Sequence, residues 1–279
     1  MLVNLNGRFI PREQAGLSIN DGGFLYGDTL FETFKAHGRR ILLMHEHLDR
    51  LELSARLLNF PCARPRLETA LRQMAQGLSA EVSRLRLTLS RGDCRGLALP
   101  DPEQGWFLLT ALKSDEPTSE QRTAGAACIL APNRRSNPLS HLPQMKRGNH
   151  ADCLYAADYA RNKGAREALF IDERQQVLEG CSSNLFALCD GKLVTPPLGS
   201  LVLGGVMRQQ LFGAAAELGI VVVERKLSLD ELFTAEEAFL SNSLIDLLPI
   251  DSIEGRRLKR GECWKELLRT IRQRIGGDG

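Results

Sequence analysis

One lysine and one glutamate in this sequence have side chains that could do chemistry together. Lys146 follows a loop with two prolines at 133–143 and is adjacent to Arg147. A lysine amine whose pKa is lowered by burial or by a nearby cation can attack a carbonyl carbon and later act as a general base. Glu179 begins the stretch EGCSSNLF at 179–186. The sequence has 36 basic and 34 acidic residues, and most charged side chains of a globular protein are solvated on its surface. Whether Lys146 and Glu179 have a chemical role is therefore decided by the motifs around them.

The composition is that of an ordinary globular protein. The 279 residues are enough for one large domain or two ordinary ones, with 43% apolar and 25% charged residues. The formal net charge of +2 gives no electrostatic reason to expect nucleic acid or a membrane surface as a partner. Seven scattered cysteines without a Cys-x-x-Cys pair argue against a disulfide framework and against a metal site. Because no apolar run is long enough for a signal peptide or a membrane span, we expect a cytoplasmic protein.

Apolar periodicity predicts a mixture of strands and helices. The Asn6-Gly7 turn predicts a hairpin over 1–10, and Gly27 inside an aromatic run indicates a close approach of two backbones. We expect helices at 45–59, 66–78, 150–163, 206–218 and 262–275, a short one from a capping box at 228–231, and strands at 82–90, 106–112, 126–130, 167–172, 185–188, 192–195, 220–224 and 238–240. Since they alternate without a regular period, the fold class is α+β (mixed α/β) rather than an eight-unit barrel.

Several motifs accompany Glu179, namely YGDTLFET at 26–33, GGVMR at 204–208 and FLSNSL at 239–244. Together they resemble the class IV aminotransferase family, whose members use pyridoxal 5'-phosphate (PLP). The resemblance extends over residues 1–255. It implies the D-amino acid aminotransferase-like PLP fold, with the cofactor in a cleft between a small N-terminal domain and a larger C-terminal domain.

A polar stretch with a proline near residue 117 suits a boundary between these two domains. We therefore expect a small domain at 1–113, a linker at 114–122 and a larger, cofactor-binding domain at 123–279. The resemblance also implies a homodimer, which the composition neither supports nor opposes.

The resemblance assigns roles to individual residues. It implies that Lys146 forms the Schiff base with PLP and that Glu179 faces the pyridine nitrogen, which must stay protonated for the ring to accept electrons. Arg50, in HLDRL at 47–51, would reach the cofactor phosphate. Further cofactor-binding candidates are Val206, Met207, Ser243 and His150. The backbone N–H groups of Val206 and Met207 open a helix after a glycine pair, and such helix N-termini bind phosphate.

Three reactions share this scaffold. They are transamination of branched-chain L-amino acids, transamination of D-amino acids, and cleavage of 4-amino-4-deoxychorismate to 4-aminobenzoate and pyruvate in folate biosynthesis. The segments FLSNSL (239–244), GVMRQ (205–209) and SRGDCRG (90–96) favour the lyase, whereas KRGNH (146–150) departs from the common lyase pattern. A class IV aminotransferase is the alternative, and a catalytically silent PLP-fold binding protein is a remote one.

The small-molecule substrate of the lyase carries two carboxylates and needs charge-assisted partners. Arg91 and Arg95 could supply them, and Tyr26 is a further substrate-binding candidate.

Overall fold

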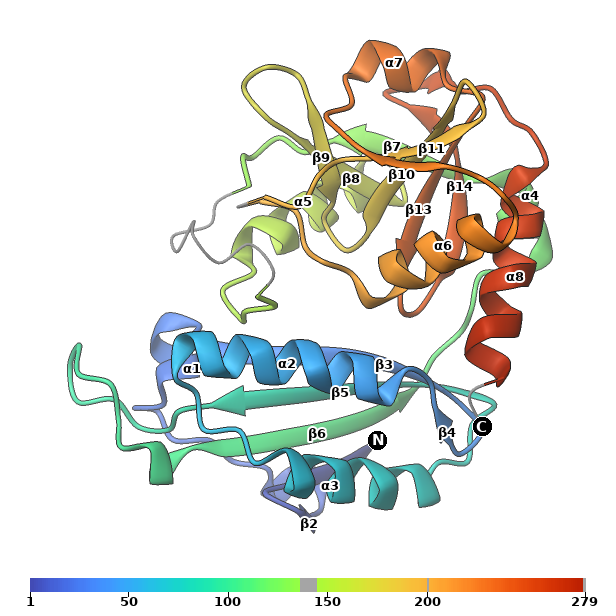
Figure 1. Cartoon of the computed structure of the whole chain (residues 1–279). Helices are drawn as coiled ribbons and strands as arrows, with labels where there is room; N and C mark the ends of the chain where they lie inside the picture. Colours follow the sequence, from blue (N-terminus) through green and yellow to red (C-terminus); the bar gives the residue numbers. More distant parts are fainter. Residues whose placement is uncertain (136–144, 200, 278–279) are drawn as a thin grey trace. The chain divides into compact units, whose positions relative to one another are not determined.

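The computed structural model describes residues 1–135, 145–199 and 201–277, and the chain divides into two compact units (Figure 1). The first unit comprises Met1–Glu116 and Met145–His150, and the second comprises Pro117–Gln144 and Ala151–Gly279. The division between residues 116 and 117 falls inside the segment expected to be a linker. The expected domains were each one continuous stretch of chain, so the prediction did not include residues 145–150 in the first unit. Most of the expected proline-containing loop at 133–143 lies outside the described residues.

The first unit is built on a six-stranded antiparallel sheet with the order β2-β1-β6-β5-β3-β4. Its strands are β1 (Leu2–Leu5), β2 (Arg8–Phe9), β3 (Thr29–His37), β4 (Arg40–Ile41), β5 (Val82–Ser90) and β6 (Trp106–Lys113). The predicted hairpin over 1–10 is confirmed, because Leu5 pairs with Arg8 across the turn. A short helix, α1 (Gly22–Tyr26), precedes β3 and was not predicted.

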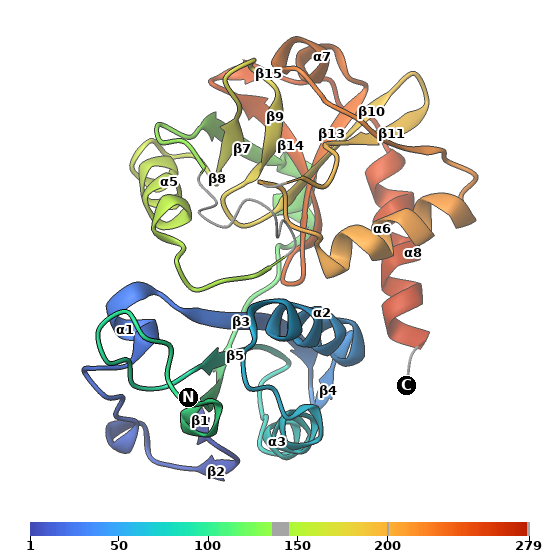
Figure 2. The ribbon, with the colours of Figure 1, turned by 60° about the vertical axis from the view of Figure 1, so that its left-hand side comes forward.

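One face of this sheet is covered by two helices, α2 (Met44–Leu58) and α3 (Arg64–Gln76), which Figure 2 shows nearly end-on. Their apolar residues form one core with every second residue of the central strands, as strand alternation requires. Leu48 and Leu51 of α2 and Leu71 of α3 are fully or almost fully buried there. The helix expected at 45–59 and the one expected at 66–78 are both confirmed.

The edge of β3 is only partly covered by β4, which pairs with Ala36 and His37 alone. At the other end of β3 the segment 145–150 lies alongside it. The N–H of Phe31 donates to the carbonyl of Lys146 at 2.9 Å, and the N–H of Gly148 donates to the carbonyl of Thr29 at 2.8 Å. Backbone hydrogen bonds to a free strand edge therefore fix the lysine segment in the first unit.

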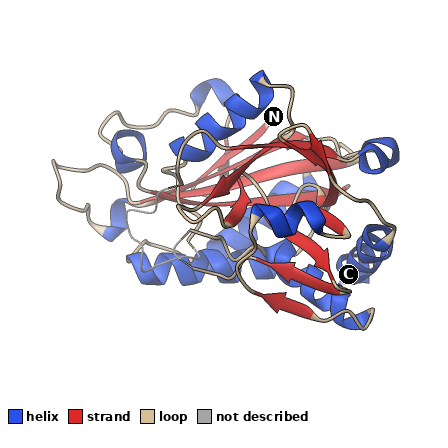
Figure 3. Cartoon of the chain, turned by 90° about the horizontal axis from the view of Figure 1, so that it is seen from above, coloured by secondary structure: helices blue, strands red, loops and turns tan. Residues whose placement is uncertain are grey.

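The second unit contains a nine-stranded mixed sheet with the order β12-β11-β10-β13-β14-β7-β8-β9, and β15 pairs with β14. Its strands are β7 (Ala126–Leu130), β8 (Glu167–Ile171), β9 (Val177–Gly180), β10 (Asn184–Cys189), β11 (Lys192–Thr195), β12 (Val222–Glu224), β13 (Glu237–Asn242), β14 (Asp246–Ile253) and β15 (Arg256–Arg257). The strands β9, β14 and β15 were not predicted. Figure 3 shows the strands of both units in red among the blue helices.

The described residues of the second unit also form five helices: α4 (Ser119–Ala124), α5 (Ala151–Asn162), α6 (Val206–Glu217), α7 (Leu229–Thr234) and α8 (Cys263–Gly277). The capping box predicted at 228–231 is confirmed, since Ser228 and Glu231 exchange both capping hydrogen bonds. The helix α4 lies in the segment expected to be a linker, where Thr118 and Gln121 form a second capping box. Among the described residues, no helix is both long and apolar enough to cross a membrane.

Candidate active site

Lys146 lies beside an aromatic ring on the face of the first sheet that α2 and α3 do not cover. Its Nζ is 4.6 Å from the centre of the Phe31 ring. The guanidinium of Arg86, on the neighbouring strand β5, is 3.8 Å from the same ring centre, and the His150 ring meets Phe31 edge-on at 5.3 Å. The basic side chains of Lys146, Arg86 and His150 therefore all lie around the ring of Phe31 in the first unit. Such a cluster attracts an anionic molecule to the lysine.

Arg50 is held in a buried charge network on the helix-covered side. Its Nε and Nη2 donate to the two oxygens of Glu32 at 2.7 and 2.6 Å. Nδ1 of His47 is 2.6 Å from the same carboxylate. Burial alone would raise the pKa of Glu32, but the charges and hydrogen bonds of Arg50 and His47 lower it to about 2. The pKa of His47 is lowered because burial outweighs the opposing effect of Glu32.

Glu179 is buried in the second unit with both carboxylate oxygens engaged. Oε2 accepts hydrogen bonds from Nδ2 of Asn184 and from the N–H of Leu203, both at 3.0 Å. Oε1 is 2.9 Å from Nη2 of Arg135. The same amide of Asn184 donates to the carbonyl of Leu203 at 2.8 Å. These contacts fix the orientation of the Glu179 side chain and connect it by hydrogen bonds to the segment that precedes α6.

The N-terminus of α6 is suited to bind an anion. Gly205 is its N-cap, and no side chain among the described residues caps this end. The N–H groups of Val206 and Met207 belong to the first turn, whose N–H groups lack partners within the helix. A Cβ at Gly205 would lie 2.0 Å from Oδ1 of Asn184, so only glycine permits this close approach. These features fit the phosphate of PLP.

Ser243 lies in the turn between β13 and β14. The preceding residue, Asn242, orders this turn, because its Oδ1 accepts from the N–H groups of Leu244 and Ile245 at 2.9 and 3.0 Å. Its Nδ2 donates to the carbonyl of Ser182, three residues after Glu179, at 3.1 Å. Ser243 and Glu179 are thus connected through one short segment of the second unit.

The substrate-binding candidates have other partners. Arg91 is buried, with Nε donating to Asp28 at 2.8 Å and Nη1 donating to the carbonyl of Asn59 at 2.6 Å. It also donates to the carbonyl of Leu58, so its guanidinium satisfies the C-terminal carbonyls of α2. These contacts give Arg91 a structural role, and its contact with substrate stays a prediction.

Tyr26 and Arg95 lie near each other along the rim of the first unit. The hydroxyl of Tyr26 donates to the carbonyl of Gly96 at 3.1 Å, and Arg95 pairs with Ala98 in a short loop. Both side chains are exposed. The predicted close approach at Gly27 is confirmed, because a Cβ there would lie 3.1 Å from Asn149.

Sequence reasoning did not single out Arg86 or Arg135. Arg86 alternates with apolar residues in β5, which predicts an ordinary solvent-facing strand residue. Arg135 is one of two consecutive arginines in an irregular stretch. Neither residue has a local pattern that reveals its partner, because Phe31 and Glu179 are distant in sequence.

Comparison with known proteins identifies the family. The sequence matches the family described as amino-transferase class IV over residues 29–253. It is 30% identical over 273 residues to a putative branched-chain-amino-acid aminotransferase of Methanocaldococcus jannaschii, covering 96% of this chain and 94% of that protein.

Two solved structures show the same fold. The structure of 4-amino-4-deoxychorismate lyase from Pseudomonas aeruginosa has a TM-score of 0.87 and 30% identity, covering 98% of each chain. The branched-chain amino acid aminotransferase of T.th., solved with pyridoxamine 5'-phosphate, has a TM-score of 0.89 and 25% identity, covering 100% of this chain and 95% of that one.

The chain belongs to the class IV aminotransferase family. It is an enzyme with the two-domain fold of that family, and the family depends on PLP. The expected fold class and cofactor are therefore confirmed.

Proposed function

We propose that Lys146 holds PLP covalently and that Glu179 faces its pyridine nitrogen. The phosphate would be bound by the N–H groups that open α6, by Ser243 and by Arg50. What supports this assignment is the fixed orientation of Glu179, which shares Asn184 and Leu203 with the entry to α6. When bound, PLP supplies an electron sink for bond breaking at the amine-bearing carbon of the substrate.

We infer that Lys146 moves the proton in the reaction. When Nζ is not bonded to the cofactor, Lys146 would act as the base that accepts the proton from the amine-bearing carbon of the substrate. Its position against Phe31 limits the directions in which the side chain can point. Glu179 would keep the ring nitrogen protonated, because a carboxylate that faces this nitrogen stabilises its positive charge. Asn184, Leu203 and Arg135 hold the carboxylate in place.

We propose further that the reaction is the cleavage of 4-amino-4-deoxychorismate to 4-aminobenzoate and pyruvate. This choice rests on a second positively charged side chain near the lysine. Arg86 and Lys146 both lie against the ring of Phe31. A substrate with two carboxylates needs such a partner in addition to the groups that bind its amine. The similarity to the Pseudomonas aeruginosa lyase over nearly the whole of both chains supports the same choice.

The deciding experiment is single-substrate turnover. We expect the purified holoenzyme, given 4-amino-4-deoxychorismate and no keto acid, to release pyruvate and 4-aminobenzoate in equal amounts over many turnovers. A transaminase would stop after one turnover, because it needs a keto acid to regain its starting form. No release of pyruvate would contradict the lyase assignment.

An aminotransferase is the second candidate. The segment 146–150 departs from the common lyase pattern, and the relative from Methanocaldococcus jannaschii is named as a branched-chain enzyme. Turnover of an amino acid that depends on added 2-oxoglutarate, with no pyruvate from 4-amino-4-deoxychorismate, would establish this alternative.

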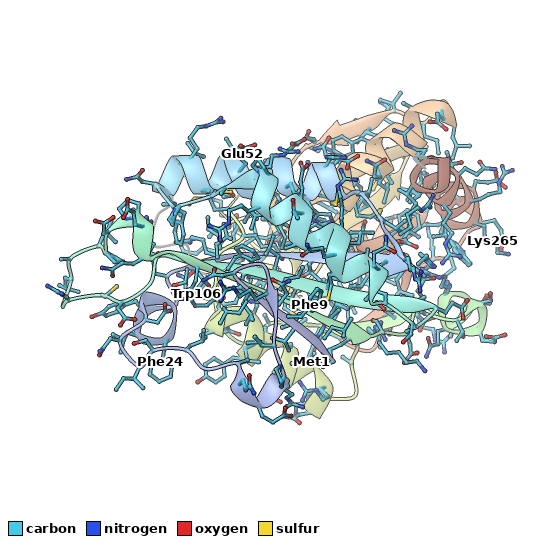
Figure 4. All side chains as sticks on the ribbon, turned by 90° about the horizontal axis from the view of Figure 1, so that it is seen from below. Met1, Phe9, Phe24, Glu52, Trp106 and Lys265 are labelled. Carbon is cyan, nitrogen blue, oxygen red and sulfur yellow. The ribbon has the colours of Figure 1, made fainter. Side chains whose placement is uncertain are left out.

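We infer that the enzyme is a homodimer. The first unit exposes apolar side chains on and near α1, including Ile19 and Phe24, and in the loop after β5, where Leu97 is 93% exposed. The labelled Phe24 lies at the periphery in Figure 4. Burial of such a surface against a second copy would remove apolar area from water. A monomer mass in solution scattering, with full activity, would contradict this inference.

A further inference from the structure

A second buried carboxylate in the second unit belongs to Glu167, the first residue of β8, which is 5% exposed. It accepts hydrogen bonds from three consecutive side chains. Oε2 accepts from the hydroxyls of Ser182 and Ser183 at 2.8 and 3.0 Å, and Oε1 accepts from the thiol of Cys181. Burial and the neighbouring Glu167 raise the pKa of Cys181, so its thiol stays protonated and can donate. Within the described part of the chain, all side-chain donors to this carboxylate are neutral.

These three donors lie in the turn 180–183, which links β9 to β10 and is folded tightly onto Glu167. The N–H of Gly180 donates to the carbonyl of Ser183 at 2.8 Å, and the N–H of Cys181 donates to the carbonyl of Ala168 at 2.9 Å. A Cβ at Gly180 would lie 2.4 Å from the hydroxyl of Ser183 and 3.0 Å from Cδ of Glu167. The turn therefore has little room to adopt another conformation while the carboxylate is in place.

Both ends of this turn lead directly to the proposed cofactor site. Glu179 precedes it and Asn184 follows it, and their side chains bond to each other at 3.0 Å. In the middle of the turn, the carbonyl of Ser182 accepts from Asn242, the residue before Ser243. A shift of the turn would therefore move the carboxylate assigned to the ring nitrogen and the hydroxyl assigned to the phosphate together.

We propose that Glu167 is a positioning residue for PLP, acting through the turn 180–183 on Glu179 and Ser243. It is not a catalytic residue, because its contacts are with the turn. The inference rests on the proposed cofactor site but does not depend on which reaction the enzyme catalyses. Charge-assisted hydrogen bonds are stronger than neutral ones, so a neutral isostere at 167 should loosen the turn without changing its size.

The test compares Glu167→Gln with Glu173→Gln, the same substitution at an exposed position beyond the end of β8. Binding of PLP to each apoenzyme is followed by visible absorbance and circular dichroism, and the absorbance of the bound cofactor is titrated with pH. For Glu167→Gln we expect about a tenfold higher dissociation constant, the effect of one charge-assisted hydrogen bond. The midpoint of the pH titration should also shift, because Glu179 would no longer be held against the ring nitrogen. Glu173→Gln should match the wild type.

A second variant covers the case in which Glu167→Gln does not fold. Ser182→Ala combined with Ser183→Ala removes two donors but keeps the carboxylate, and it should change the PLP affinity and the pH midpoint in the same direction. Wild-type values in the folded Glu167→Gln protein would overturn the proposal, and if that protein is unfolded, wild-type values in the double variant would overturn it.

Glu179→Gln is measured in parallel to separate two kinds of failure. If Glu179→Gln alters the pH midpoint and neither Glu167→Gln nor the double serine variant does, the role of Glu167 alone is overturned. If Glu179→Gln also behaves as the wild type, the proposed cofactor site is wrong and the inference falls with it.

Discussion

Arg135 and Glu179 form an ion pair within the second unit, with 2.9 Å between Nη2 and Oε1. The side chains of both residues are largely buried, at 14% and 4% exposed. Burial alone would lower the pKa of Arg135, but the charge of Glu179 and smaller contributions from Cys153 and Asp152 raise it. The guanidinium also donates to the sulfur of Cys153 at 3.0 Å. The carboxylate assigned to the ring nitrogen is thus already balanced by a cation from the protein.

Replacement of Arg135 by methionine should destabilise the apoenzyme. Breaking a buried ion pair costs about 3–5 kcal/mol, and because Arg135 keeps some exposure we expect about 2 kcal/mol. The measurement is urea unfolding at neutral pH. Arg134→Met is the matched control, because Arg134 is exposed. Equal unfolding free energies for the two variants would show that the ion pair contributes nothing to stability.

Glu32 should make the protein sensitive to acid. Its pKa is lowered from 4.5 to about 2, so the folded protein binds this proton more weakly than the unfolded chain does. The resulting stabilisation is complete above about pH 4.5 and is lost as the pH falls towards 2. Its size is about 3 kcal/mol.

Urea unfolding at several pH values between 2 and 6 tests this expectation. The acid slope of the wild type should be much reduced in Glu32→Gln, whereas Glu81→Gln, at an exposed position, should keep it. An unchanged slope in Glu32→Gln would assign the acid sensitivity to other carboxylates.

Lys146 should carry the cofactor. Borohydride treatment of the holoenzyme should fix the pyridoxyl group to this residue, and peptide mapping by mass spectrometry identifies the modified lysine. Lys146→Arg should remain folded and show no fixed pyridoxyl group. A label on Lys35, which is buried against Glu116, or on another lysine would refute the assignment.

Arg86 should recognise a carboxylate of the substrate. Removing a charge-assisted hydrogen bond costs about 1.5–3 kcal/mol, so Arg86→Met should raise KM about tenfold to a hundredfold and change kcat little. Arg84→Met removes an exposed arginine from the same face of β5 and serves as the control. Steady-state kinetics with the physiological substrate make the comparison. A loss confined to kcat would place Arg86 in the chemical step instead.

Gly205 should be intolerant of a side chain. A Cβ there would lie 2.0 Å from Asn184, so Gly205→Ala must displace the amide that holds Glu179. We expect weaker PLP binding and a destabilisation of about 1–3 kcal/mol from overpacking. Gly199→Ala is the control, because a Cβ at that position meets no atom within 4 Å. Equal PLP affinity in both variants would argue against the importance of this close approach.

Local sequence patterns predicted most elements, because periodicity, caps and turns are encoded within a few residues of one another. The capping box at Ser228 and the Asn6-Gly7 hairpin are examples. The missed helix α4 also has a capping box, but its polar composition and a nearby proline favoured a linker. The strand β14 contains Pro249, which argues against a strand in the absence of known neighbours.

The candidate site was predictable only where residues lie within a motif. Lys146 and Glu179 belong to recognisable motifs, whereas their immediate partners come from distant parts of the chain. The pairing of Arg135 with Glu179 and of Arg86 with Phe31 depends on tertiary structure, which a single sequence does not specify through local periodicity. The contact of Arg91 with the C-terminus of α2 could not be predicted either, because the local sequence does not distinguish a buried arginine from one in a surface loop.

The return of residues 145–150 to the edge of β3 has a consequence for how this protein can be divided. The chain passes from the first unit to the second after Glu116, comes back at Met145, and leaves again after His150. A fragment that ended at Glu116 would have its sheet and helices but not Lys146, and the remaining fragment would carry Lys146 without the strand that orders it. Modular exchange between relatives, gene splitting and circular permutation must therefore treat this six-residue segment as part of the N-terminal unit.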